Sequence, residues 1–342
     1  MKKRVGYFDI AKGIGIILVV IAHIEYMPLA MREYIVTFHM PAFFVISGML
    51  MHLTKEAERR LKPLLAHKFI RIFLPYLVFS LIYPVSYYLR FMITGEGYSA
   101  ELFRQDIIAG ISMMGVSVLW FLPELFFSEL IVLVIIRNLK RPWIIAVTVL
   151  SLAGSWFVPL AIPVLTLFLW RLVYCCILVL IGYYFFPIVN QVSGKPNILL
   201  IISLLLFIVL YFTGRENGIV DLHYIVTGNK ILYFLNAAMG SMALILLSIF
   251  IEARLKSFGY VLQFFGRYSL FIMLTHIDFM VLYFAEKLAF VLSELSIKAK
   301  EAIFNVSATA GALVIETVMI IIWEKIKKCG ILFISGKTKS KE

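Results

Sequence analysis

The sequence has few charged residues. Asp, Glu, Lys and Arg make up 15% of its 342 residues, whereas apolar residues make up 62%. A soluble globular chain has about a quarter charged and about half apolar residues. This chain has too few polar residues to cover the surface of a soluble protein of its size. The composition therefore excludes a soluble globular protein and predicts a protein whose surface lies in a lipid bilayer.

Cysteine is scarce as well, with three residues in the chain. Cys175 and Cys176 are adjacent within an apolar run, and Cys329 lies among basic residues near the C-terminus. Three cysteines placed in this way exclude a disulfide framework. The sequence predicts no metal site and no permanently bound cofactor.

Acidic residues are fewer than basic ones, which gives a formal net charge of +12. The basic residues form short clusters between apolar runs instead of a stripe along one soluble domain. This distribution excludes nucleic-acid binding and is typical of loops at the anionic cytoplasmic face of a membrane.

The apolar residues form ten runs, and a membrane-spanning helix needs about 20 mostly apolar residues. Strand-period alternation and internal repeats are lacking. We therefore predict an all-α polytopic integral membrane protein of a single domain, residues 1–342, with about ten transmembrane helices. The predicted spans are 8–27, 34–53, 72–93, 117–136, 143–160, 163–187, 196–213, 231–250, 266–288 and 302–323.

Lys and Arg orient these spans. With the N-terminus inside, the cytoplasmic segments hold 21 of the 32 Lys and Arg residues and the outer segments hold 7. This bias predicts an even number of spans with both termini in the cytoplasm, and a basic cytoplasmic tail at 324–342.

Ionisable residues within the spans are costly and are functional candidates by default. They are Asp9, Lys12, His23, His39, Glu124, Glu129, Arg171, His276, Asp278 and Glu316. Arg171 and Glu316 are most simply explained as an interhelical ion pair. His52, His67 and His223 lie at or beyond the span ends, so we expect them to be solvated.

Three of these groups are predicted to share one layer. Counted along their helices, His23, His39 and Glu124 lie in the outer half of the membrane, whereas Lys12 lies about 16 Å below His23 near the cytoplasmic surface. Asp9 is one turn from Lys12 and can pair with it. The arrangement predicts a shaft with a cation at its inner mouth and proton-transferring groups near its outer end. Such a shaft suits a donor with an anionic head and a long thin arm.

Five motifs occur in order along the chain. Helix 1 has a basic residue, ten residues and then a histidine, Lys12 to His23. The others are FHMPAFFVISG (38–48), KFIRIFLPY (68–76), LWFLPELFF (119–127) and FGRYSLFIMLTH (265–276). Together they resemble the membrane acyltransferase 3 family, in particular its fucose 4-O-acetylase-like and surface-polysaccharide acetyltransferase branch. The motif-bearing region is 7–276, and Lys12 stands where many members have arginine.

The resemblance implies a reaction and a set of site residues. It implies transfer of an acetyl group from cytoplasmic acetyl-CoA, or another acyl-CoA, to a sugar hydroxyl of a surface or lipid-linked glycan. Phosphates of the donor would meet Lys12, Lys68 and Arg71, with Ser47 along the donor arm. His23 would act as general base or carry the acyl group, assisted by His39. Glu124 joins the catalytic group from its depth alone, and Trp120 and His276 are expected to contact the acceptor.

Two alternatives remain open. The same fold could transfer succinyl groups to an exopolysaccharide, and embedded charges also suit a transporter of glycans or lipid-linked sugars. A transporter of that kind should show internal repeats. We expect the protein in the bacterial cytoplasmic membrane, in contact with lipids. The sequence does not identify the acceptor sugar or the oligomeric state.

Overall fold

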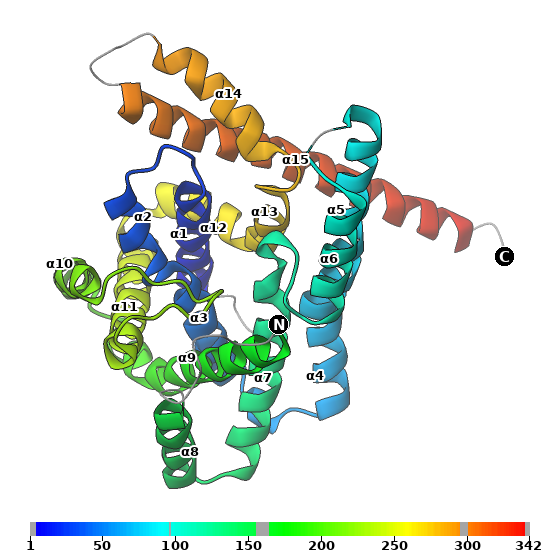
Figure 1. Cartoon of the computed structure of the whole chain (residues 1–342). Helices are drawn as coiled ribbons and strands as arrows, with labels where there is room; N and C mark the ends of the chain where they lie inside the picture. The colour runs from blue at the N-terminus through cyan, green and yellow to red at the C-terminus, as the bar shows by residue number, and fades with distance from the viewer. Residues whose placement is uncertain (1–4, 96, 155–163, 295–299, 339–342) are drawn as a thin grey trace.

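The computed structural model describes residues 5–95, 97–154, 164–294 and 300–338, and these ranges contain helices and turns without a β-strand (Figure 1). One isolated β-bridge joins Asp221 to Val226. The first half of the chain forms α1 (Gly6–Ala22), α2 (Leu29–Val36), α3 (His39–Leu53), η1 (Glu56–Glu58), α4 (Leu61–Lys68), η2 (Phe69–Phe73), α5 (Leu74–Thr94), α6 (Ala100–Ile111), η3 (Ser117–Trp120), α7 (Phe121–Asn138) and α8 (Arg141–Gly154). The second half forms α9 (Val164–Val192), α10 (Pro196–Asn217), α11 (Lys230–Arg254), α12 (Lys256–Arg267), α13 (Ser269–Thr275), α14 (Val281–Ser293) and α15 (Lys300–Thr338).

Seven segments of the described chain are long and apolar enough to cross a membrane. They are Leu29–Leu53, Leu61–Ile93, Ser117–Asn138, Thr166–Val192, Pro196–Asn217, Lys230–Arg254 and Lys300–Lys328. Each overlaps a predicted span, so the described residues agree with the prediction of a helical, multi-pass membrane protein. The remaining predicted spans, 8–27, 143–160 and 266–288, are not among these seven.

The three remaining segments differ from the prediction in different ways. Helix α1 has 17 residues and ends at Ala22, so it is shorter than predicted. Helix α8 has 14 residues, and the rest of the predicted span, 155–160, lies outside the described residues. The predicted continuous helix 266–288 is wrong, because the chain turns between Thr275 and Val281 with Met280 at a φ of 60°.

The predicted span 34–53 is also interrupted. Helix α2 ends at Val36, and α3 begins at His39 after a turn at Thr37 and Phe38. An apolar run shows where a chain can enter a bilayer, but it does not show where its helix breaks. Both breaks place a histidine of the predicted site at a helix end.

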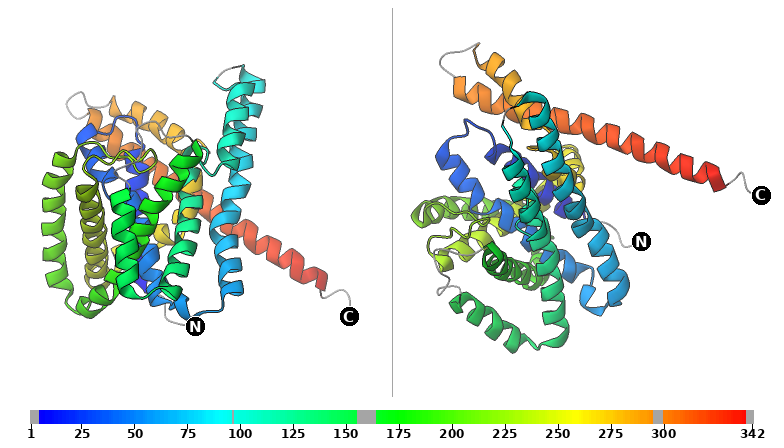
Figure 2. Two further views of the ribbon diagram at one scale, coloured as in Figure 1. Left: turned by 60° about the horizontal axis from the view of Figure 1, so that its bottom comes forward. Right: turned by 45° about the vertical axis from the view of Figure 1, so that its right-hand side comes forward.

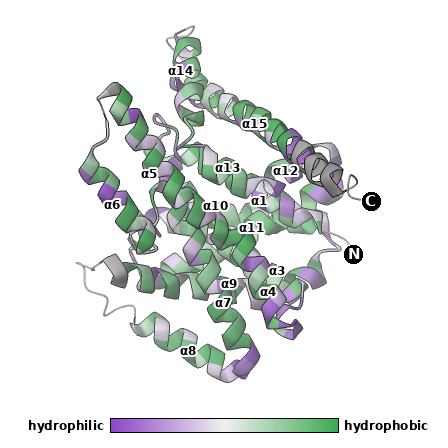
Figure 3. Ribbon diagram, turned by 90° about the vertical axis from the view of Figure 1, so that its right-hand side faces the viewer, coloured by the Kyte–Doolittle hydropathy of each residue, from purple (hydrophilic) through white to green (hydrophobic). Residues whose placement is uncertain are grey.

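Apolar side chains face outward on the peripheral helices. On α10, Ile201, Leu205, Ile208 and Phe212 are each more than half exposed and follow one face at helical spacing. Figure 3 shows hydrophobic residues along the helices, with hydrophilic residues gathered at ends such as the α7–α8 turn. Such a surface is stable when lipid covers it.

Close helix crossings build the centre of the bundle. A Cβ atom at Gly48 of α3 would lie 1.9 Å from the Val179 carbonyl oxygen of α9, and one at Gly182 would lie 1.9 Å from the Val45 carbonyl oxygen. The two helices therefore touch backbone to backbone at reciprocal glycines, as small residues allow in membranes. This crossing fixes α3, which carries Ser47 and His39.

Helix α15 extends far beyond the bundle. It packs beside α14 at its N-terminal part and then continues away from the other helices (Figure 2). The predicted tail 324–342 is thus helical as far as Thr338. The cytoplasmic location of the termini stays a prediction from the charge pattern.

Candidate active site

Two cavities lie end to end in the centre of the bundle. We name them after the orientation that the charge pattern predicts. The inner cavity, of about 280 Å³, extends from Lys12 and Arg71, and the outer cavity, of about 330 Å³, contains His23 and His39. Both are lined by the same three apolar residues, Val19 of α1, Met40 of α3 and Met273 of α13. We call these three residues the neck. The predicted shaft therefore corresponds to two cavities that adjoin at an apolar neck.

The inner cavity brings together all four residues predicted to bind the donor. Lys12, Ser47, Lys68 and Arg71 line it from α1, α3, α4 and the π-helical turn η2. Most of the remaining lining is apolar. Lys12 pairs with Asp9 at 3.3 Å, which confirms the predicted pair one turn apart. Arg71 is exposed and has no ion-pair partner in the described part of the chain.

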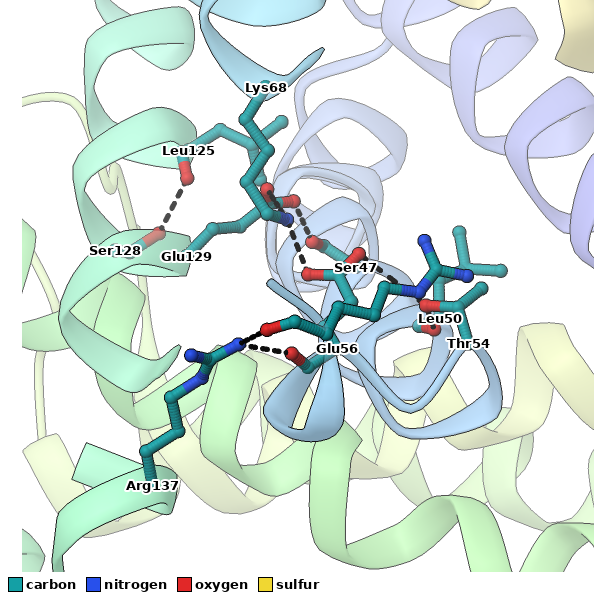
Figure 4. A network of polar contacts seen from close by, with 10 residues as sticks. Ser47, Leu50, Thr54, Glu56, Lys68, Leu125, Ser128, Glu129 and Arg137 are labelled. Atoms are coloured by element: carbon teal, nitrogen blue, oxygen red, sulfur yellow. Dashed lines mark hydrogen bonds and ion pairs between the residues drawn. The ribbon is translucent and has the colours of Figure 1, made fainter. Parts of the chain in front are cut away.

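Lys68 is held more tightly than the sequence predicted. Its Nζ lies 2.7 Å from Glu56 and 2.6 Å from Glu129, and the Ser47 hydroxyl donates to the same Glu129 (Figure 4). Arg137 Nη2 donates to the Glu56 carbonyl oxygen at 2.8 Å and so fastens the η1 turn. Lys68 is 5% exposed. A donor phosphate could bind its ammonium group only by displacing a carboxylate.

The outer cavity contains two histidines at helix ends. His23 is the C-cap residue of α1, and His39 is the first residue of α3. Nδ1 of His23 lies 2.8 Å from the Val19 carbonyl oxygen, and Nδ1 of His39 lies 2.9 Å from that of Ile35. A carbonyl oxygen only accepts, so Nδ1 carries the proton in each neutral ring and Nε2 keeps its lone pair. Each ring is thereby oriented to accept a proton at Nε2.

His276 lines neither cavity. It is fully buried, and its ring centroid lies 5.2 Å from that of His23, edge to face. Its Nδ1 also contacts a carbonyl oxygen one turn back, that of Ile272, at 2.9 Å. His276 therefore packs behind His23, and the contact with the acceptor stays a prediction for it.

Glu124 also lies outside both cavities. Its Oε1 accepts from Nε of Arg171 at 2.5 Å, and both side chains are fully buried. The predicted pair of Arg171 with Glu316 is wrong, because Glu316 accepts from the Thr275 hydroxyl at 2.9 Å instead. A pattern of isolated embedded charges showed that pairs were needed but not which residues formed them.

The Glu124–Arg171 pair supports one wall of the outer cavity. Arg171 Nη1 donates to the His223 carbonyl oxygen at 3.1 Å, and its guanidinium lies 5.1 Å from the centre of the Trp120 ring. The His223 ring stacks on Trp120 at 5.1 Å and 7°. Trp120 is 8% exposed, so little of its surface is left to stack on a sugar. It lines the outer cavity at the predicted place.

His223 is more buried than expected for a solvated residue. The loop 218–229 folds inward, so that His223 lines the outer cavity and is half-buried. Burial and the Arg171 guanidinium lower the pKa of His223 to about 4, so its imidazole is neutral at pH 7. His52 is half-buried too, with its ring 4.7 Å from that of Tyr183. His67 is exposed, as expected, at the rim of the inner cavity.

Sequence reasoning missed several residues of the two cavities. Arg32, Asp221 and His223 line the outer cavity, and Glu56 lines the inner one. All four lie outside the predicted spans or at their edges, where depth along a helix gives no information. Glu129 was singled out as an embedded charge, but nothing in its neighbourhood along the chain indicated Lys68 as its partner.

The family comparison agrees with this arrangement. A family model described as an acyltransferase domain matches residues 5–323, which is nearly the whole chain and includes all the residues of both cavities. No curated protein and no solved structure matched the chain. Because the match covers far more than half of its length, the chain belongs to the acyltransferase 3 family and is a membrane acyltransferase.

Proposed function

We propose that the protein is an O-acetyltransferase that moves an acetyl group from cytoplasmic acetyl-CoA to a sugar hydroxyl of a surface or lipid-linked polysaccharide. The observation that carries this proposal is the pair of cavities that adjoin at the neck, with a cationic inner mouth and two histidines in the outer cavity. The location that suits this reaction is the bacterial cytoplasmic membrane.

The donor would bind in the inner cavity. Its phosphates carry negative charge that Lys12 and Arg71 can neutralise at the mouth, and the apolar lining beyond them suits a thin arm. Lys68, which is already neutralised by two carboxylates, is a weaker partner for phosphate. The thioester at the end of the arm would pass between Val19, Met40 and Met273 and reach His23.

The acceptor would bind in the outer cavity. His23 Nε2 takes the proton of the sugar hydroxyl as its oxygen attacks the thioester carbonyl carbon. The tetrahedral intermediate collapses, the C–S bond breaks, and the thiolate of CoA leaves and takes the proton from His23. His39 is the second base within the same cavity, and Arg32 supplies positive charge beside the developing oxyanion. Glu124 acts through Arg171 on the cavity wall and contacts no substrate.

There are two alternatives to this proposal, a different acyl group and a different class of protein. A succinyl donor would use the same cavities and would differ in the mass added to the glycan. Membership in an acyltransferase family favours an enzyme over the transporter alternative.

Replacement of His23 tests the proposal. His23→Ala removes the proposed base, so transfer of radiolabelled acetyl from acetyl-CoA to glycan should fall by about a hundredfold or more. Purified variant and wild-type protein should have the same thermal midpoint, since the His23 ring is exposed to the cavity. Full activity of His23→Ala would overturn the mechanism. Glycan mass spectrometry of cells with and without the gene would distinguish added acetyl from succinyl groups.

A further inference from the structure

A third cavity lies beside the proposed active site. It has a volume of about 660 Å³ and is bounded by α5, α6, η3 and the turn between α13 and α14. Figure 1 shows α5 and α6 side by side at one edge of the bundle. Its polar lining consists of Tyr87, Arg90, Tyr98, Asp106, Ser117 and Asp278. The reaction proposed above uses none of these residues.

The polar groups of this cavity are organised by their contacts. The Tyr98 hydroxyl donates to Asp106 Oδ2 at 2.5 Å, and the Tyr87 hydroxyl donates to Asp278. The two tyrosine rings meet edge to face with centroids 5.5 Å apart. Carboxylates that accept from a tyrosine on one oxygen retain lone pairs on the other for further donors.

This set of groups fits a polyhydroxylated ligand. Sugar hydroxyls donate to carboxylates and accept from guanidinium groups, and hydrogen bonds to charged groups are about twice as strong as neutral ones. Aromatic rings provide apolar surface for the C–H faces of a sugar. A volume of several hundred Å³ is within the range of ligand pockets. Because two carboxylates and a guanidinium are costly beside hydrocarbon, the cavity must hold water or a polar ligand.

One short segment separates this polar cavity from the outer cavity. Val116 and Ser117 line the polar cavity, whereas Val118 and Trp120 line the outer cavity. A chain of sugars with one unit near His23 could therefore place an adjoining unit in the polar cavity. A lone sugar would use the outer cavity only.

We propose that the polar cavity of Tyr87, Arg90, Tyr98, Asp106, Ser117 and Asp278 is a second acceptor subsite, which binds a sugar unit adjoining the one that is acylated. This proposal rests on the proposed function. It makes the enzyme selective for oligomeric glycan over single sugars.

The test compares acceptors of different length. The probe is a ladder of fragments from O-deacylated surface polysaccharide, taken from a strain without this gene and partially hydrolysed with acid. Radiolabelled acetyl-CoA is the donor. Asp106→Asn and Tyr98→Phe should each raise KM for fragments of several units about tenfold, while KM for acetyl-CoA and transfer to the single sugar stay unchanged. Glu101→Gln on the same helix is the control, because Glu101 is exposed and pairs with Arg104 outside the cavity.

The outcomes separate this proposal from the proposed function. Wild-type protein that transfers acetyl to no fragment would overturn both. Active wild-type protein with Asp106→Asn and Tyr98→Phe equal to Glu101→Gln would overturn the subsite alone. Equal losses for single and oligomeric sugars would overturn it as well, since they would indicate a general effect on folding or catalysis.

Discussion

His23, His39 and His276 share one local geometry. Each stands at a helix end, and each has Nδ1 within 3 Å of the carbonyl oxygen four residues earlier. In each case a backbone carbonyl oxygen orients the imidazole ring, as a carboxylate does in many histidine sites. The motifs identified two histidines that line the outer cavity, but the role of the backbone depends on helix breaks that no motif shows.

The buried charges around Lys68 lead to a prediction about stability. Lys68→Ala would leave the buried Glu129 and the partly buried Glu56 together without a cation, so the free energy of unfolding should fall by about 3 kcal/mol. Thermal midpoints of the purified protein in detergent would measure this loss. Lys62→Ala, an exposed lysine on the same helix, is the control and should change little.

The same variant distinguishes a structural from a donor-binding role. Additional replacement of Glu129 by Gln should restore part of the lost stability, since it removes one unpaired carboxylate. If Lys68→Ala instead kept its stability and lost affinity for acetyl-CoA, the lysine would be a phosphate ligand as its sequence motif suggested.

At the scale of helices, the crossing of α3 and α9 depends on the absence of side chains. Gly182→Ala would place a methyl group 1.9 Å from the Val45 carbonyl oxygen, so the helices must separate. Overpacking of this kind costs about 1–3 kcal/mol. We expect a lower thermal midpoint and weaker acyl transfer, because α3 carries Ser47 and His39.

The matched control for this crossing is Gly194→Ala. A Cβ atom at Gly194 meets nothing within 4 Å, so this variant should match wild-type protein in midpoint and activity. Equal behaviour of the two variants would show that α3 and α9 do not approach as closely as the structure has them.

Helices were predictable where apolar runs were long and uninterrupted. Runs such as 196–213 and 231–250 appear as α10 and α11 with similar bounds. The run 266–288 is as apolar as these two runs, yet it contains the turn at 276–280. On either side of this turn, α13 packs against α1 and α14 packs against α15, and contacts between distant segments cannot be predicted from local composition.

At the scale of the whole molecule, the neck connects the two proposed substrate sites. Met40→Trp would fill the space between Val19 and Met273, so the thioester could no longer reach His23. We expect transfer to fall by about tenfold or more, while binding of CoA to the inner cavity, measured by calorimetry, stays within about twofold. Met31→Trp, at an exposed position of α2, is the control for bulk alone.

The sequence predicted only part of the arrangement of the candidate site. Spacing along helix 1 predicted Lys12 and His23 near opposite ends of one shaft, and the structure has Lys12 in the inner cavity and His23 in the outer one. Glu124 was placed at a similar depth, but depth does not state which way a side chain points around its helix. It faces Arg171 instead of the cavity. Of the polar cavity beside η3, the sequence singled out only Asp278, because α5, α6, η3 and the loops near them form its lining.

The apolar character of the neck also has a consequence for proton transfer between the two cavities. Val19, Met40 and Met273 carry no side-chain group that could pass a proton between the two cavities. We therefore expect lipid vesicles that contain the protein to hold a proton gradient for as long as vesicles without it.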